Sequence, residues 1–247
     1  MKKILLGMIF ILIGCTSIDS MNVKTTSSSQ LLKMEVNDKC LDVNPEKSRY
    51  IGAQAEKAGD IPCAKKAFKN ACDLKDEPGC VLLAFLENST GNIKEAVKIL
   101  DSACKNGTAD PCFFLGIIEE KVKNQSAAQS AFLAACAKDH PAGCSNAGTN
   151  LEESGEIAQA EKMYSKSCSL GNNLGCSFLG ILESRLGRIE EAKSIFQNLC
   201  EKGYLPGCSS FGAQWYFSGQ HEKARTIWDE ACRKGGNDSC KALIKYK

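Results

Sequence analysis

Apolar residues recur along most of this chain at the spacing of short amphipathic helices. Within residues 175–206, Leu179, Leu182 and Leu186 fall on one face of a helix. Gly187 then interrupts the pattern, as glycine does where a helix ends. A second apolar stripe follows it, formed by Ile189, Ala192, Ile195, Phe196 and Leu199. The pattern therefore predicts two short helices joined by a tight turn.

The same two-helix pattern returns every 32 residues, and cysteine marks it most clearly. Six cysteines stand 32 residues apart, and each is followed eight residues later by another: Cys72 and Cys80, Cys104 and Cys112, Cys136 and Cys144, Cys168 and Cys176, Cys200 and Cys208, Cys232 and Cys240. A column of small residues keeps this period: Gly52, Ala84, Gly116, Gly148, Gly180 and Gly212. So does a column of large residues: Phe68, Leu100, Phe132, Tyr164, Phe196 and Trp228. One hairpin of this size cannot bury its own apolar face, so we predict an all-α solenoid of about six stacked hairpins.

We place the repeat domain at residues 39–247 and divide it by this period. The units are 47–78, 79–110, 111–142, 143–174, 175–206 and 207–238, with 239–247 as a C-terminal cap. The first unit is irregular, because Ser48 stands where a cysteine is expected and Pro62 falls early in the second helix, where proline is tolerated. In the third unit Lys123 and Asp139 replace glycine, so we expect its turns to differ.

The first residues have the pattern of an export signal. Lys2 and Lys3 precede an apolar run of about ten residues, 4–13, whereas a membrane-spanning helix needs ~20. We therefore assign residues 1–14 to a signal peptide. Residues 15–38 are rich in serine and threonine, which is typical of a flexible tether.

The end of this signal, Leu12-Ile13-Gly14-Cys15, resembles a bacterial lipobox. The resemblance implies that Cys15 is lipidated and anchors the domain to an envelope membrane, in the periplasm or at the cell surface. Thr16 stands where an aspartate would favour inner-membrane retention, so the outer membrane is favoured. The alternative is an ordinary signal peptide with an unrelated cysteine.

Charge and cysteine content narrow the class of protein. Lysine and arginine number 31 against 29 acidic residues, and loss of Lys2 and Lys3 with the signal leaves no net charge. A nucleic-acid-binding protein needs a basic surface, so we do not expect that partner. The 15 cysteines are typical of an oxidising compartment.

Two further motifs connect the repeats to a known family. One motif is a leucine followed by glycine in the first helix, as at Leu115-Gly116 and Leu179-Gly180. The other is a glycine with an alanine five residues later, as at Gly155 and Ala160. The pattern resembles the Sel-one-like branch of the tetratricopeptide-like superfamily, and with its paired cysteines it is similar to the cysteine-rich secreted bacterial members. The resemblance implies stacked helical hairpins, each clamped by one disulfide.

Each pair of cysteines eight residues apart is expected to form a bond. The first lies near the end of one helix and the second near the start of the next, so the intervening turn brings them together. Cys40 and Cys63 remain, and we expect them to bond each other. The alternative for these two is free or intermolecular thiols. There is no C-x-x-C motif, and His140 and His221 stand alone, so no metal or cofactor is expected.

The resemblance also raises a catalytic alternative, because some members of that family hydrolyse penicillins slowly. The matching S-x-x-K motif would be Ser102 and Lys105, with the serine as nucleophile. The companion motifs of serine β-lactamases are absent. A polar residue at a helix end explains Ser102 equally well. Weak β-lactam hydrolysis is therefore the alternative function.

A binding surface is expected where the first helix of each unit lines the concave face. Carrying over these columns gives the candidates Phe85, Phe113, Ile117, Ser145, Thr149, Ser177, Ile181, Arg185, Ser209, Tyr216 and Phe217. The aromatic run Trp215, Tyr216 and Phe217 can instead pack in the core and cap the end of the array. The expected function is that of a non-catalytic envelope scaffold that binds a protein, a peptide or a peptidoglycan fragment.

Overall fold

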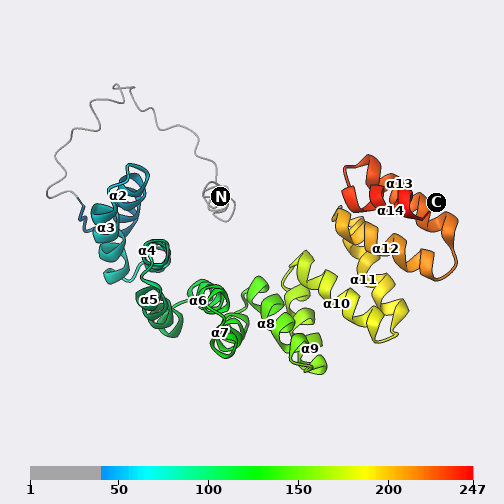
Figure 1. Cartoon of the computed structure of the whole chain (residues 1–247), viewed down its shortest axis with the longest axis horizontal. Coiled ribbons are helices and arrows are strands. Elements are labelled where there is room, and N and C mark those ends of the chain that lie inside the picture. The colour runs from blue at the N-terminus through cyan, green and yellow to red at the C-terminus, as the bar shows by residue number, and fades with distance from the viewer. Residues whose placement is uncertain (1–39, 247) are drawn as a thin grey trace, which may run out of the picture. The chain divides into compact units, whose positions relative to one another are not determined.

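The computed structural model describes residues 40–246 (Figure 1). The predicted signal peptide, the lipid site at Cys15 and the tether lie outside these residues. The described part is all helical, with no strand, and comprises α2 (Pro45–Lys57), α3 (Ile61–Asp73), α4 (Glu77–Ser89), α5 (Ile93–Asn106), α6 (Asp110–Lys121), α7 (Gln125–Ala137), α8 (Pro141–Glu153), α9 (Ile157–Ser169), α10 (Asn173–Arg185), α11 (Ile189–Glu201), α12 (Leu205–Phe217), α13 (His221–Arg233) and α14 (Asn237–Lys245). The predicted solenoid of helical hairpins is confirmed.

Six hairpins follow one another in chain order, from α2 with α3 to α12 with α13 (Figure 1). We call the even-numbered helices first helices and the odd-numbered helices second helices. Each helix packs against the next one along the chain. First helices also contact each other directly, at α2 with α4, α4 with α6, α6 with α8, α8 with α10 and α12 with α14. Residues 32 apart on successive first helices of these pairs are therefore neighbours.

Polar residues at the start of the first helices fix where those helices begin. The side chains of Asn44, Asp76 and Asn172 each accept a hydrogen bond from a backbone N–H of the first turn. His140 does the same for α8, because its Nδ1 accepts from the N–H of Gly143 at 2.9 Å. Pro62 lies in the first turn of α3, as expected.

The turns of the third unit keep the geometry of the other units. Lys123 and Asp139 both have a φ of 63°, in the left-handed region that glycine occupies elsewhere. The expectation that these turns differ is therefore wrong. The turn that does differ follows α5: Gly107 has φ −119° and ψ −155°, so the backbone there is extended.

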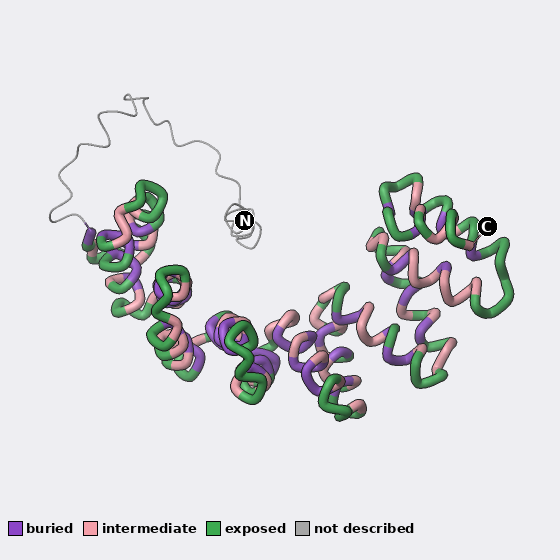
Figure 2. Tube along the Cα trace, viewed as in Figure 1, coloured by how far each residue is buried: buried purple, intermediate pink, exposed green. Residues whose placement is uncertain are grey.

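The core lies between the two helices of each hairpin and between neighbouring hairpins, as the buried stretches in Figure 2 indicate. The small and large columns meet there. A Cβ placed on Gly116 would lie 2.5 Å from the ring of Phe132, so a larger residue would push the two helices apart. In α14 the same column holds Ile244, which is exposed because no second helix packs on it within the described residues.

Candidate functional site

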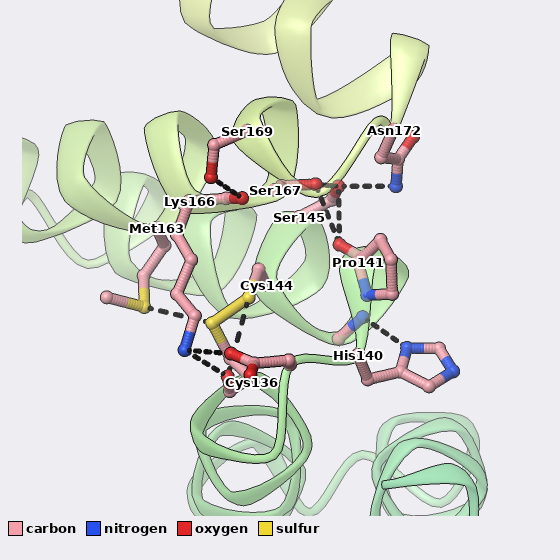
Figure 3. The surroundings of a disulfide bond; sticks show 12 residues. Cys136, His140, Pro141, Cys144, Ser145, Met163, Lys166, Ser167, Ser169 and Asn172 are labelled. Atoms are coloured by element: carbon pink, nitrogen blue, oxygen red, sulfur yellow. Dashed lines mark hydrogen bonds and ion pairs between the residues drawn. A yellow bond between two sulfur atoms is a disulfide. The ribbon is translucent and has the colours of Figure 1, made fainter.

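The disulfides clamp each hairpin to the next. The six predicted pairs are bonded: Cys72–Cys80, Cys104–Cys112, Cys136–Cys144, Cys168–Cys176, Cys200–Cys208 and Cys232–Cys240. Each joins the last turn of a second helix to the first turn of the following first helix, as Figure 3 shows for Cys136 and Cys144. The expected local pairing is confirmed, and it fixes the relative position of the helices that carry the candidate surface.

The structure also joins Cys40 to Cys63. This bond holds the start of the described chain against the N-terminus of α3. Ser48, which replaces a cysteine, is buried; it accepts a hydrogen bond from the Asn70 amide at 2.8 Å and donates to the carbonyl of Asp42 at 3.2 Å. At the position where the other units have a disulfide cysteine, the first unit therefore has a hydrogen-bonded serine.

Seven disulfides in residues 40–246 indicate a protein that matures in an oxidising, extracytoplasmic compartment. None of the described helices has the length and apolar character needed to cross a membrane. Among the same residues no three histidine, cysteine, aspartate or glutamate side chains gather as metal ligands would.

Four candidates, three of them apolar and the fourth a threonine, form a partly exposed stripe on the first helices. Phe85, Ile117 and Thr149 are half-buried, and Ile181 is 43% exposed. They stand 32 residues apart on α4, α6, α8 and α10, whose successive members are in contact. We call these four residues the first-helix stripe.

Ser145, another candidate, is buried and is not part of the exposed surface. Its Oγ lies 2.7 Å from the Oγ of Ser167 and accepts from the Asn172 amide at 3.1 Å. The expectation that it faces a ligand is therefore wrong, because Ser145 and Ser167 satisfy each other inside the seam between α8 and α9. Phe113 is half-buried and stacks on the His140 ring at a centroid distance of 4.3 Å.

Three further candidates contact neighbouring groups, Ser177 through its hydroxyl, Ser209 through its backbone carbonyl and Arg185 through its guanidinium. Ser177 donates to the carbonyl of Asn173 in its own helix at 3.0 Å, and the carbonyl of Ser209 accepts from the Trp228 indole at 2.9 Å. Arg185 pairs with Glu152, whose other oxygen accepts from the Tyr164 hydroxyl at 2.8 Å. Burial raises the pKa of Tyr164 to about 12, so it remains a donor at neutral pH.

The C-terminal aromatic residues divide between packing and exposure. The Tyr216 ring lies 5.7 Å from Trp228 and 4.5 Å from Tyr246, so it belongs to the end cap. Phe217 is 73% exposed. The end-cap alternative therefore describes Tyr216, and Phe217 stays available to a partner.

Ser102 and Lys105 lie on the last turns of α5. Ser102 is exposed, and the ammonium of Lys105 is 2.6 Å from a carboxylate oxygen of Asp101. Lys105 is therefore engaged with an acid one turn earlier. A lysine that activates a serine must instead reach the serine hydroxyl.

Three buried glutamates near the ends of first helices were not predicted from the sequence. They are Glu87, Glu119 and Glu183. Each meets a donor five residues later: the amides of Asn92 and Asn124, both at 2.8 Å, and the guanidinium of Arg188. Glu87 also pairs with Lys65 at 2.6 Å. The recurring glutamate followed by asparagine or arginine was the signal that could have found them.

A groove of about 560 Å³ opens between α3 and α5, across one side of α4. Leu83 and Ile99 contribute apolar surface, and Glu87 lies among the lining residues. Lys69, Lys75 and Lys98 also line it. Ser102 lies on the α5 wall, so this serine borders a groove that the sequence did not predict.

No protein-family model matches this chain, and no curated protein matches its sequence. Solved structures match its fold. The Escherichia coli protein c5321, a protective antigen with an SLR fold, aligns over 81% of this chain and 48% of its own length, with a TM-score of 0.65 and 16% identity. This chain thus spans about half of that protein.

Two further structures align over most of their own length. A Sel1 repeat protein from Oxalobacter formigenes covers 79% of this chain and 86% of its own, with a TM-score of 0.59 and 18% identity. YrrB, a TPR protein with an unusual peptide-binding site, covers 72% and 98%, with a TM-score of 0.52 and 19% identity. With its stacked helical hairpins, this chain has the solenoid fold shared by Sel1-like and TPR proteins.

Proposed function

We propose that this protein is an envelope scaffold that binds an extended segment of a partner protein along the first-helix stripe. A lipid on Cys15 anchors it, and residues 15–38 give the domain reach from the membrane. The lipobox-like residues before Cys15 and the seven disulfides support this location.

The stripe is the observation that carries the proposal. Its four residues follow one another on contacting first helices, and each keeps part of its side chain accessible. An extended peptide can lay alternate apolar side chains along such a row. The peptide-binding site of YrrB, which has the same fold, supports a polypeptide partner. A peptidoglycan peptide is the smaller ligand that the same row could accept.

Slow β-lactam hydrolysis receives less support from the geometry. Lys105 pairs with Asp101, and within the described residues no other base is found in hydrogen-bond contact with Ser102. We therefore keep the scaffold as the proposed function.

The proposal is tested by recovery of partners from the native cell envelope with a tagged full-length chain. The double variant Ile117→Glu with Ile181→Glu places two charges on the stripe and is expected to lose the recovered partner at least tenfold. Leu133→Glu is the matched control, because Leu133 is 37% exposed but lies on the second helix α7. Equal recovery by wild type and the stripe variant would refute the assignment.

A further inference from the structure

Asn106 is followed by Gly107, and this is the one Asn-Gly pair in the sequence. Asn106 is the last residue of α5, and its side chain is exposed. Glycine has no Cβ, so its backbone nitrogen can come close to the side-chain amide of the preceding residue. The chemistry of this pair is independent of the proposed function.

The turn after α5 leaves the backbone N–H of Gly107 without an acceptor in the described part of the chain. In the five other turns at this column, the residue has a left-handed φ and donates its N–H to the carbonyl of the cysteine three residues earlier, at 2.9 to 3.0 Å; these residues are Lys75, Asp139, Gly171, Gly203 and Gly235. Gly107 is extended, and among the described residues neither its N–H nor the carbonyl of Asn106 takes part in a hydrogen bond. The peptide group between Asn106 and Gly107 can therefore rotate without breaking a backbone hydrogen bond.

Contacts on both sides hold the turn in this conformation. The carboxylate of Glu77 accepts from the hydroxyl of Thr108 and from its backbone N–H, the latter at 2.8 Å. The ammonium of Lys138 donates to the carbonyl of Gly107 at 2.7 Å. The side chain of Asn106, by contrast, has a single exposed hydrogen bond, from its amide to a carbonyl one turn earlier in α5 at 3.0 Å. Water competes for such a bond, so the amide can turn toward the nitrogen of Gly107.

From this arrangement we infer that Asn106 deamidates through a cyclic imide. The backbone nitrogen of Gly107 bonds to Cγ of Asn106, and the bond from Cγ to Nδ2 breaks. Nδ2 leaves as ammonia with the proton that the backbone nitrogen loses. Water then opens the five-membered ring. Addition at Cγ gives an aspartate in a normal main chain, and addition at the backbone carbonyl gives isoaspartate, whose main chain runs through Cγ. Water is the only co-reactant, and no group is oxidised or reduced.

Both products loosen the contact of this turn with α4. A new carboxylate at the C-terminus of α5 is disfavoured by the helix dipole. The turn already holds a carboxylate, because a Cβ on Gly107 would lie 2.9 Å from Oε2 of Glu77. In isoaspartate the main chain before Gly107 is also one methylene longer, which shifts Thr108 relative to Glu77. Since Glu77 begins α4 and Thr108 precedes α6, deamidation weakens a tie between these two first helices.

The test follows conversion in the purified, oxidised full-length chain, kept in neutral detergent at mildly alkaline pH. After reduction and digestion, liquid chromatography with mass spectrometry separates the asparagine, aspartate and isoaspartate forms, and isoaspartyl methyltransferase labels the last. Asn106→Gln keeps an amide but needs a six-membered ring, which forms far more slowly. The matched control is Lys202→Asn, which makes a second Asn-Gly pair at the same column. Lys202 is exposed, as Asn106 is, but the N–H of Gly203 is bonded to the carbonyl of Cys200 at 2.9 Å.

The two pairs are compared within one molecule, and each rate is divided by the rate of the same pair in the reduced, unfolded chain. We expect this ratio to be at least tenfold higher at Asn106 than at the asparagine of Lys202→Asn, and no conversion at residue 106 in Asn106→Gln. No conversion at Asn106, or equal ratios at the two pairs, would overturn the inference.

Hydrogen exchange measures the consequence for the turn. Exchange of the Thr108 amide should rise at least tenfold in the converted protein and stay unchanged in Asn106→Gln kept for the same time. An unchanged rate in the converted protein would show that the contact with Glu77 survives deamidation, and would overturn the proposed loosening.

Discussion

At the scale of single residues, the buried glutamates near the ends of the first helices show how a carboxylate is accommodated inside the repeat, because each one has a hydrogen-bond or ion-pair partner. Glu87 and Glu183 each have a cationic partner, whereas Glu119 has the Asn124 amide. In the fourth unit the same column holds Leu151, which is also buried. Burying a carboxylate is costly, so leucine at this column should serve the fold as well.

Glu119→Leu is therefore expected to change the free energy of unfolding by less than about 1 kcal/mol, because it leaves no buried cation unpaired. Glu119→Ala should cost about 2 kcal/mol, since it opens a cavity at the same place. Urea unfolding monitored by circular dichroism measures both. A loss of several kcal/mol in the leucine variant would mean that the carboxylate itself stabilises the seam.

His140 gives the fold a dependence on pH. Burial lowers the pKa of His140, and the nearby Asp110, 3.5 Å from Nε2, opposes this effect. The folded protein therefore binds the proton more weakly than the unfolded chain does. The stability contributed by neutral His140 is full above pH ~6.5 and is lost as the pH falls toward the lowered value.

His140→Asn should remove this dependence, because asparagine does not titrate. The start of α8 should be kept, because asparagine can cap a helix as Asn172 does for α10. Thermal unfolding at about pH 7.5 and pH 5.5 should show a fall in the wild type that is smaller in the variant. The same fall in both proteins would assign the pH effect to other groups.

The packing partner of a residue can be predicted from the sequence when both residues recur in every unit. It cannot be predicted when the partner occurs in one unit only. The contact between Gly116 and Phe132 follows from the period, because each unit has a small residue in its first helix and a large residue in its second helix at these columns. Ser145 also stands in a periodic column, yet it is buried because Ser167 happens to face it. Nothing in a single column could have predicted that pairing.

At the scale of helices and turns, the disulfides act as local clamps. Removing one with Cys136→Ala and Cys144→Ala should lower the free energy of unfolding by about 2.5 kcal/mol, from the entropy of closing a short loop. Hydrogen exchange should rise in α7 and α8 and stay unchanged in α12 and α13, since each hairpin contacts its neighbours.

The double variant Cys232→Ala with Cys240→Ala is the comparison, because it releases α14 at the end of the array. We expect a smaller loss of stability there than in the centre. A uniform rise in exchange over all helices would contradict local clamping and would indicate that the array unfolds as one unit.

The turns show where element-level prediction reaches its limit. A glycine after a second helix suggests a left-handed turn, as at Gly171 and Gly203. Gly107 is extended instead, because Glu77 accepts a hydrogen bond from the backbone N–H of Thr108, the next residue, and this bond holds the backbone out of the left-handed turn. That contact joins residues 31 apart, so local sequence cannot reveal it.

At the scale of the whole molecule, the period predicted the solenoid and the six repeated disulfides. It did not predict the groove between α3 and α5, whose lining includes residues that do not repeat, such as Lys75 and Ser102. A repeat fixes the shared framework, and surfaces lined by non-repeating residues have to be found in the structure.

The proposed membrane attachment depends on lipidation of Cys15. Cys15→Ser should release the protein from the membrane fraction into the soluble fraction and abolish labelling with a palmitate analogue, because several acyl chains anchor far more strongly than none. Ser17→Ala is a neighbouring control that should leave both unchanged. Labelling that persists in the Cys15 variant would exclude this cysteine as the lipid site.

The proposed partner protein lies along the first-helix stripe. The most direct measurement places a photo-crosslinking amino acid at Ile181 or Ile117 in the native cell and compares it with the same probe at Leu133. We predict one discrete protein adduct from both stripe positions and none from Leu133, which has similar exposure on a second helix. Adducts of equal yield from all three positions, or from Leu133 alone, would show that the partner does not lie along the first-helix stripe.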